Sequence, residues 1–162
     1  MQSSIQLFTH FHYLNTKACQ IDQNQSMAIA DGKVIWRGTQ IPHTLPIGDV
    51  TIQIPNEKDA IDLQGAYIMP GMINLHCHIS GSGKKLPKFL SSPTLTSFLK
   101  KTLLVRRMIW KTMVTNVENA LKSGVTTLRS LGDPFDSIAE LQTQISAESI
   151  RGARLFHAGK AL

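Results

Sequence analysis

Two histidines separated by one residue, His76 and His78, are the side chains of this sequence best placed to do chemistry. They end an apolar run that follows Pro70-Gly71, and the residue types of that run favour extended backbone. Side chains alternate between the two faces of a strand, so both imidazoles project from one face and Cys77 from the other. Neutral imidazole is a common ligand of divalent metals. The pattern allows a metal site, but a His-x-His tripeptide can also combine one buried and one surface histidine.

The context of these histidines resembles a known family. Residues 67–78 resemble the first barrel strand of the metal-dependent amidohydrolase superfamily, where an apolar run, Pro-Gly, two apolar residues, an acid or amide and His-x-His follow one another. Residues 120–133 resemble the second-strand segment with its Gly-Val-Thr-Thr, and residues 151–159 resemble the third strand. The overall similarity is to imidazolonepropionase- and prolidase-like members. Asn74 stands where many members carry Asp.

The resemblance implies a hydrolase of carbon–nitrogen bonds in a small-molecule substrate: a non-peptide amide, a cyclic amide or a dipeptide-like compound. It implies one or two divalent metals, with zinc expected, and it makes His76 and His78 the first two metal ligands. The catalytic residues and remaining ligands are expected beyond residue 162. Since a barrel of this kind needs about 250 residues, the chain is either the front part of a larger enzyme or a truncated relative of one, and we expect these residues to be inactive by themselves.

The sequence predicts an α/β chain in two parts. Residues 1–65 contain short alternating strands and an Asp31-Gly32 hairpin turn, with a polar loop expected over residues 14–26. These residues predict a small all-β unit, which the resemblance implies is the N-terminal part of a small β-sandwich. Residues 66–162 alternate strands with helices expected over 94–122 and 137–150, which predicts parallel strands with right-handed crossovers. With the resemblance, they are the first three βα units of a TIM-like (β/α)8 barrel, incomplete in this chain.

Two further residues are candidates for contact with a substrate. Asp133 follows the second barrel strand, where it can reach a site, but Gly-Asp-Pro is also an ordinary turn. His157 lies in the third strand and is either a core or rim residue or a substrate-binding residue. Both alternatives stay open from the sequence.

Basic residues are concentrated between Lys84 and Lys122, where nine of them accompany the single acid Glu118, while the whole chain carries a net charge of +6. A basic amphipathic helix can bind an anionic membrane, nucleic acid or an acidic partner. No aromatic stacking pattern supports nucleic acid, and a helix that covers a barrel needs the same apolar stripe as one that binds a membrane. The alternative to the enzyme is thus a truncated, non-catalytic relative that binds or assembles through this helix.

Cellular location and assembly follow from weaker signals. No apolar run approaches the ~20 residues that span a bilayer, and the N-terminus lacks the pattern of a secretory signal. The two cysteines, Cys19 and Cys77, form no Cys-x-x-Cys pair. These observations predict a cytoplasmic protein without membrane or nucleic-acid partners. Three barrel strands leave an unpaired edge, which predicts a homo-oligomer.

Overall fold

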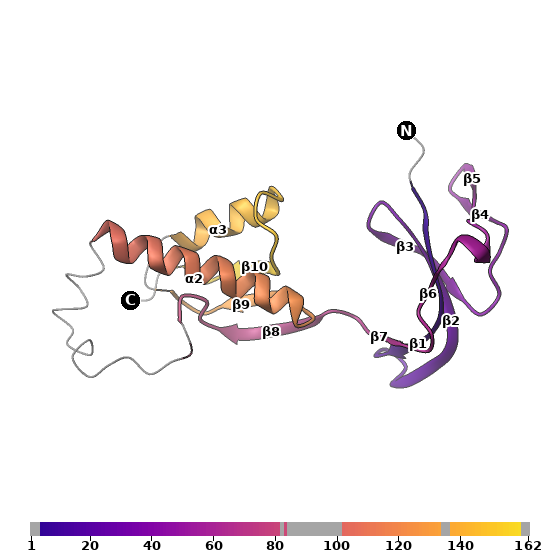
Figure 1. Cartoon of the computed structure of the whole chain (residues 1–162), viewed down its shortest axis with the longest axis horizontal. Coiled ribbons are helices and arrows are strands. Elements are labelled where there is room, and N and C mark those ends of the chain that lie inside the picture. Colours follow the sequence, from indigo (N-terminus) through magenta and orange to yellow (C-terminus); the bar gives the residue numbers. More distant parts are fainter. Residues whose placement is uncertain (1–3, 82, 84–101, 134–136, 160–162) are drawn as a thin grey trace. The chain divides into compact units, whose positions relative to one another are not determined.

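The computed structural model describes residues 4–81, 83, 102–133 and 137–159 (Figure 1). The chain divides into two compact units, Met1–Pro70 (unit 1) and Gly71–Leu162 (unit 2). Among the residues that the structure describes, no helix is long and apolar enough to cross a membrane.

Unit 1 is built on one five-stranded sheet and one separate hairpin. The order of the large sheet is β3-β2-β1-β6, with β7 also paired to β1. The bounds of its strands are β1 Gln6–Asn15, β2 Gln20–Ala30, β3 Lys33–Gly38, β6 Ile61–Asp62 and β7 Tyr67–Ile68. A second sheet pairs β4 (Thr44–Ile47) with β5 (Val50–Gln53), and a short 3-10 helix, η1, spans Glu57–Asp59. Leu7, Ala28 and Ile54 form the buried core of the unit. The complete sandwich stays a prediction.

The Asp31-Gly32 hairpin is confirmed. Asp31 (φ 49°) and Gly32 (φ 70°) both adopt positive φ between β2 and β3, as a type I′ turn requires. The prediction of a loop over residues 14–26 is wrong, because β2 begins at Gln20 and pairs with β1.

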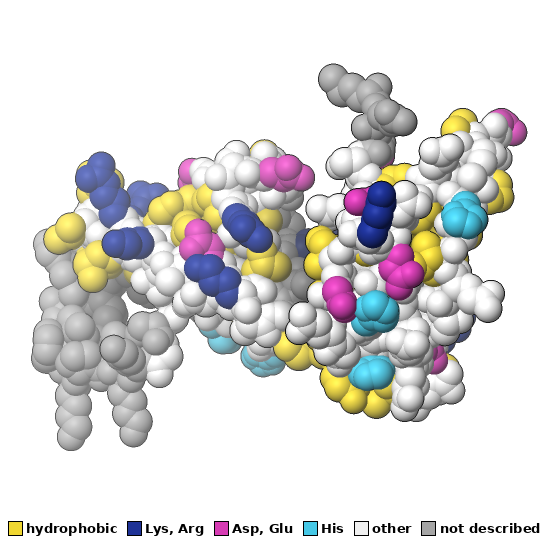
Figure 2. All heavy atoms as spheres, turned by 45° about the vertical axis from the view of Figure 1, so that its right-hand side comes forward, with side chains coloured by type: hydrophobic (Ala, Val, Ile, Leu, Met, Phe, Trp, Pro, Cys, Tyr) yellow, Lys and Arg dark blue, Asp and Glu magenta, His cyan; other side chains and the backbone are white. Residues whose placement is uncertain are grey.

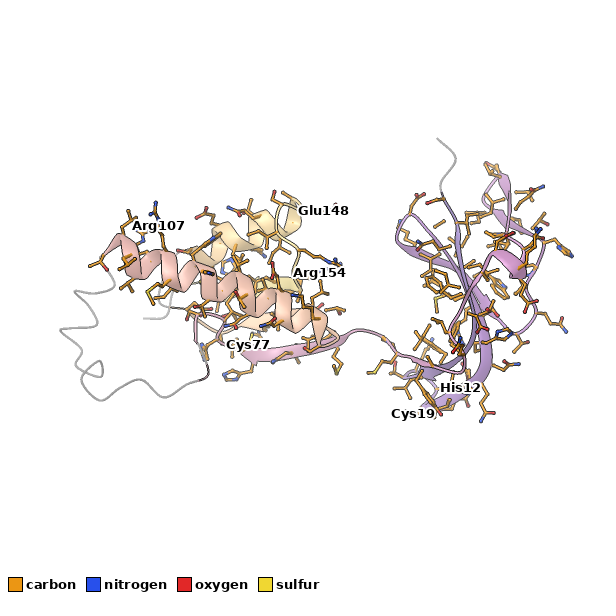
Figure 3. All side chains as sticks on the ribbon, viewed as in Figure 1. His12, Cys19, Cys77, Arg107, Glu148 and Arg154 are labelled. Atoms are coloured by element: carbon orange, nitrogen blue, oxygen red, sulfur yellow. The ribbon has the colours of Figure 1, made fainter. Side chains whose placement is uncertain are left out.

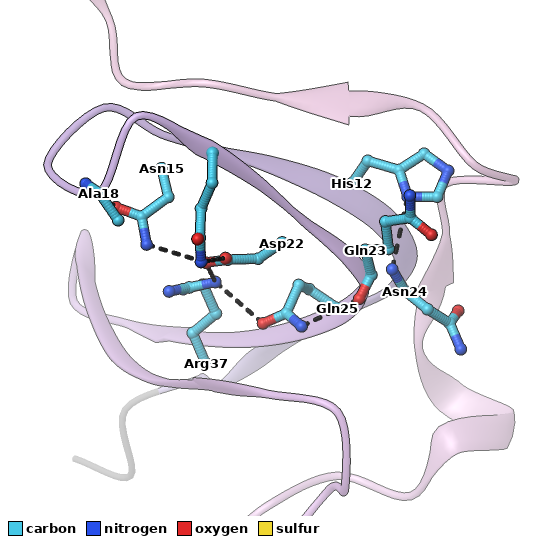
Figure 4. A network of polar contacts seen from close by, with 9 residues as sticks. His12, Asn15, Ala18, Asp22, Gln23, Asn24, Gln25 and Arg37 are labelled. Carbon is cyan, nitrogen blue, oxygen red and sulfur yellow. Dashed lines mark hydrogen bonds and ion pairs between the residues drawn. The ribbon is translucent and has the colours of Figure 1, made fainter.

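The first part of β2, residues 20–26, was not predicted because polar contacts stabilise it. The Asp22 carboxylate accepts hydrogen bonds from Asn15 (3.0 Å), Gln20 (2.7 Å) and Arg37 (2.9 Å), as Figure 4 shows. The hydrogen bonds from Gln20 and Asn15, together with the Arg37 guanidinium, hold the pKa of Asp22 below its ordinary value of 3.8. A strand whose side chains satisfy one another in this way lacks the apolar alternation by which strands are recognised.

Unit 2 is a three-stranded parallel sheet with two helices. The strand order is β10-β9-β8, and both helices lie on one side of the sheet (Figure 1). The element bounds are β8 Met72–Cys77, α2 Leu103–Lys122, β9 Val125–Ser130, α3 Ser137–Ser146 and β10 Arg154–His157. The expected alternation of parallel strands and helices is confirmed, whereas the count of three complete βα units stays a prediction.

The core of unit 2 lies between the helices and the sheet. Met113 and Val117 of α2 pack with Leu128 of β9, Leu141 of α3 and Leu155 of β10. The helix α2 ends where Gly124 adopts φ +86°, the conformation expected of a glycine just after a helix. Residues 94–101, which the sequence assigned to the same helix, lie outside the described residues.

The two motif segments meet at the start of the sheet. The Met72 N–H donates to the Gly124 carbonyl oxygen at 2.9 Å, where β8 and β9 begin to pair. A Cβ atom built on Gly71 would lie 2.7 Å from the Cβ of Thr126. Since real Cβ atoms do not approach so closely, the glycine of Pro70-Gly71 gives room to a threonine of Gly-Val-Thr-Thr.

Candidate metal site at the ends of three parallel strands

The two histidines of the motif lie together at the carboxyl end of β8. His76 is in the strand and His78 follows directly after it, and both are exposed. Their ring centroids are 5.7 Å apart, with the ring planes inclined by 75°. The alternation predicted from the sequence therefore places the two imidazoles side by side.

The backbone at the end of β9 sets the protonation of one ring. The Nδ1 atom of His78 lies 2.6 Å from the carbonyl oxygen of Gly132. A carbonyl oxygen only accepts hydrogen bonds, so Nδ1 carries the proton and donates it. In the neutral ring, Nε2 then keeps its lone pair. Ligating histidines in metal sites are commonly oriented by such a contact to a carbonyl group.

This donor set fits the beginning of a zinc site. Metal–nitrogen bonds of about 2 Å place the centroids of two imidazoles on one tetrahedral ion roughly 5 Å apart, close to the separation of His76 and His78. A catalytic zinc ion needs three protein ligands. Within the residues that the structure describes, however, no group of three or more His, Cys, Asp or Glu side chains is placed to hold a metal. Among the described residues, the pair alone therefore does not complete a ligand set.

The segment that follows His78 is held from two sides. The Ser80 N–H donates to the Oδ1 atom of Asp133 at 2.8 Å. From the other side, the side-chain amide of Asn116 donates to the carbonyl oxygens of Ile79 (2.8 Å) and Gly81 (2.9 Å). The Ile79 side chain is buried in the core of unit 2. The path of the chain from His78 to Gly81 is therefore set by packing and by three hydrogen bonds.

Asp133 is fully engaged inside the protein. The residue is 1% exposed. Its Oδ1 atom accepts the Ser80 N–H, and its Oδ2 atom accepts the hydroxyl proton of Ser130. Its own N–H donates to the Gly159 carbonyl oxygen at 3.4 Å. Asp133 thus joins the ends of β8, β9 and β10.

His157 lies at the end of β10, in register with Ser130 of β9. It is half-buried, and its Nδ1 atom accepts a hydrogen bond from the Gly159 N–H at 3.1 Å. A neutral ring that accepts at Nδ1 carries its proton on Nε2. His157 therefore presents an N–H donor, whereas His78 presents a lone pair.

Cys77 lies between the two histidines in sequence but belongs to a different environment. It packs against the core of unit 2, and its Sγ atom lies 3.5 Å from the Arg129 carbonyl oxygen. Figure 3 labels it at the end of β8. Burial, and secondarily the charge of Asp133, raises the pKa of the Cys77 thiol above its ordinary value of 9.0. A thiol in this state is a poor metal ligand, since cysteine binds metals as the thiolate.

The sequence missed the polar groups that support the site. Asn116 was not a candidate, because it lies outside the motif segments and its partners are 35 and 37 residues away in the chain. Ser130 lies within the second-strand segment, but a serine in a strand gives no sign of its contact with Asp133. The one sequence signal for Asn116 is its position inside a helix. Asparagine is unfavourable there unless its side chain has a partner, so the position weakly indicates a contact.

The basic character of α2 is partly visible. Its described basic residues, Arg106, Arg107, Lys111 and Lys122, are exposed, and Figure 2 shows Lys and Arg side chains dispersed among acidic and apolar ones on the visible face of unit 2. Five further basic residues of the segment, Lys84, Lys85, Lys88, Lys100 and Lys101, lie outside the described residues.

Comparisons with known proteins agree with this geometry. A model of the amidohydrolase family matches residues 67–156. An imidazolonepropionase from Kosmotoga olearia is 27% identical over 143 residues, which cover 79% of this chain and 32% of that protein.

Two solved structures share the fold. A protein from Bifidobacterium longum that is assigned as a prolidase is 26% identical, with a TM-score of 0.63 over 97% of this chain and 30% of that one. A Xaa-Pro dipeptidase with methionine bound in its active site is 23% identical, with a TM-score of 0.70 over 98% of this chain and 34% of that one. This chain therefore spans about a third of the length of the proteins it matches. Because the family model covers more than half of its residues and includes both histidines, the chain belongs to the amidohydrolase family.

Proposed function

We propose that this chain is part of a hydrolase that cleaves carbon–nitrogen bonds of a small molecule, and that His76 and His78 are two ligands of its divalent metal. The observation that carries the proposal is the hydrogen bond from His78 Nδ1 to Gly132, which leaves a lone pair on Nε2 of a ring whose centroid lies 5.7 Å from that of His76. Zinc is the proposed ion, because imidazole nitrogen suits it.

The proposed mechanism assigns separate tasks to the chain's residues. A bound divalent metal would supply Lewis-acid polarisation of the substrate and acidify a water. His76 and His78 would hold it, and Gly132 keeps the His78 ring in the ligating tautomer. The Nε2–H group of His157 is proposed to donate a hydrogen bond to the substrate. For Asp133 we propose a positioning role, since both of its oxygens are engaged within the protein.

The remaining parts of the active site are proposed to lie in the region of the full-length protein that corresponds to the part of the relatives not matched by this chain. These parts are the third ligand and the group that handles the proton. We also propose that unit 1 is the N-terminal part of an accessory β-sandwich and that the protein is a homo-oligomer. With two protein ligands, the 162 residues by themselves are expected to bind zinc weakly and to turn over no substrate at a steady rate.

The substrate class is proposed from the relatives. An imidazolonepropionase, a Xaa-Pro dipeptidase and a molinate hydrolase are among the similar proteins. The candidate substrates are therefore cyclic amides and dipeptides that contain a proline, and both classes should be tested in the same assay.

The deciding experiment uses the full-length protein. Hydrolysis of a panel of cyclic amides and Xaa-Pro dipeptides is measured before and after removal of metal with a chelator, and after zinc is restored. The proposal expects loss and recovery of activity, with His76→Ala and His78→Ala inactive and short of bound zinc. Hydrolysis that survives both the chelator and the two substitutions would refute it.

A further inference from the structure

We propose that Asn116 is a positioning residue for the metal site, acting through the segment that carries His78. This inference rests on the proposed function, because it assumes that His78 is a metal ligand. It goes beyond that function by assigning a role to a side chain on α2, a helix that supplies no proposed ligand.

The geometry of the contact carries the inference. One amide group, the Nδ2 of Asn116, donates to two carbonyl oxygens that lie two residues apart, Ile79 at 2.8 Å and Gly81 at 2.9 Å. A single side chain thus fixes the chain on both sides of Ser80. The backbone of Ser80 is fixed in turn by Asp133.

The glycine at position 81 explains why the two hydrogen bonds from Asn116, here called the Asn116 clamp, are needed. Gly81 is a glycine with space around it, since a Cβ atom built there would meet nothing closer than the His78 carbonyl oxygen at 3.8 Å. Glycine loses more conformational freedom on ordering than any other residue. Without a partner from α2, the carbonyl groups of Ile79 and Gly81 would lose their donor, and the segment after His78 would be held only by the packing of Ile79 and by Asp133.

The consequence reaches the metal through His78. Its ring must keep the 2.6 Å contact to Gly132 while it stays beside the His76 ring, at a centroid separation of 5.7 Å. Both conditions depend on where the backbone of residue 78 lies. Partners that orient a ligating group typically change metal affinity by 10–100-fold when they are removed.

The chain offers a matched control on the same helix. Asn119 lies three residues after Asn116 and lines the same cavity of about 460 Å³ between β8 and α2. It is exposed, and the structure gives its side chain no hydrogen bond among the described residues. The substitutions Asn116→Asp and Asn119→Asp therefore add the same charge to nearly the same place, but only the first removes two hydrogen bonds.

The test measures Co²⁺ affinity of the full-length protein by the visible absorption of the ion. Asn116→Asp is expected to weaken binding by at least tenfold, although a negative charge near a cation would by itself strengthen it. Asn116→Ala is expected to weaken binding too, and it serves if the aspartate variant does not fold. Asn119→Asp is expected to bind as well as the wild type or more tightly.

A second measurement tests the effect of the Asn116 hydrogen bonds on the backbone in the absence of metal. In the metal-free protein, hydrogen exchange at the Ser80 amide is expected to accelerate by about tenfold or more in both Asn116 variants and to stay unchanged in Asn119→Asp. Unchanged Co²⁺ affinity in the Asn116 variants, or equal weakening in Asn119→Asp, would overturn the inference and leave the proposed function standing. If wild-type Co²⁺ binding does not depend on His78, the proposed function fails, and the inference falls with it.

Discussion

The Nδ1 atom of His78 and the carbonyl oxygen of Gly132 lie 2.6 Å apart, although 54 residues separate them in the chain. The contact joins the end of β8 to the residues that follow β9. Because its acceptor is a backbone atom, no side-chain substitution at another position removes it directly. The fold of the sheet therefore decides which nitrogen of His78 faces outward.

This relationship and the contact of His157 predict opposite tautomers for two histidines at the carboxyl ends of β8 and β10. The neutral His78 ring is expected to carry its proton on Nδ1, and the neutral His157 ring on Nε2 because its Nδ1 atom accepts from Gly159. Long-range ¹H–¹⁵N correlation spectra of the metal-free protein distinguish the two forms. A proton on Nε2 of His78 would contradict the assignment of that atom as a ligand.

Replacement of Gly71 by alanine is predicted to destabilise unit 2. The new methyl group would overlap the Thr126 side chain at the point where β8 meets β9. Overpacking of this kind costs about 1–3 kcal/mol, which urea denaturation can measure. Gly81→Ala is the control, because its methyl group finds ordinary contact distances. Equal free energies of unfolding for the two variants would show that Thr126 moves aside without cost.

The sequence predicted the parts of this molecule that are local or belong to motifs. The Asp31-Gly32 turn needs only two residues with positive φ, and the strands and helices of unit 2 follow from apolar spacing. The first part of β2, residues 20–26, was missed, because its polar side chains hydrogen-bond to one another and leave no apolar alternation.

The support of the candidate site could not be predicted for a different reason. His76 and His78 are neighbours in the chain, so their spacing alone brings them together. The contact of Asn116 with Gly81 spans 35 residues, and that of Ser80 with Asp133 spans 53. Such contacts depend on how α2 and β9 pack against β8, which residue types and spacing do not specify.

Neutralising Asp133 is predicted to loosen the ends of all three strands. Asp133→Asn replaces one of two acceptor oxygens with a donor, so either the Ser80 N–H or the Ser130 O–H loses its acceptor in a buried place. The expected loss is about 1–3 kcal/mol of unfolding free energy. A matched control is Glu148→Gln on the exposed turn after α3, labelled in Figure 3, for which we expect a change within about 0.5 kcal/mol. A stable Asp133→Asn variant would refute the structural role of this carboxylate.

The reactivity of Cys77 provides a pH-dependent test of the same surroundings. Burial, and secondarily the charge of Asp133, raises the pKa of the Cys77 thiol above 9.0. Only the thiolate is alkylated, and at pH 8 less than about a tenth of Cys77 is present as the thiolate. In a Cys19→Ser background, alkylation by iodoacetamide is therefore expected to be slow at pH 8 and to accelerate as the pH rises beyond 9. Adding Asp133→Asn removes the repelling charge, lowers the pKa of Cys77 and should speed alkylation at pH 8, provided that circular dichroism shows the variant folded. If the alkylation rate of the Cys19→Ser variant instead depends on pH as for a free thiol, with a midpoint below pH 9, Cys77 is not buried against the core.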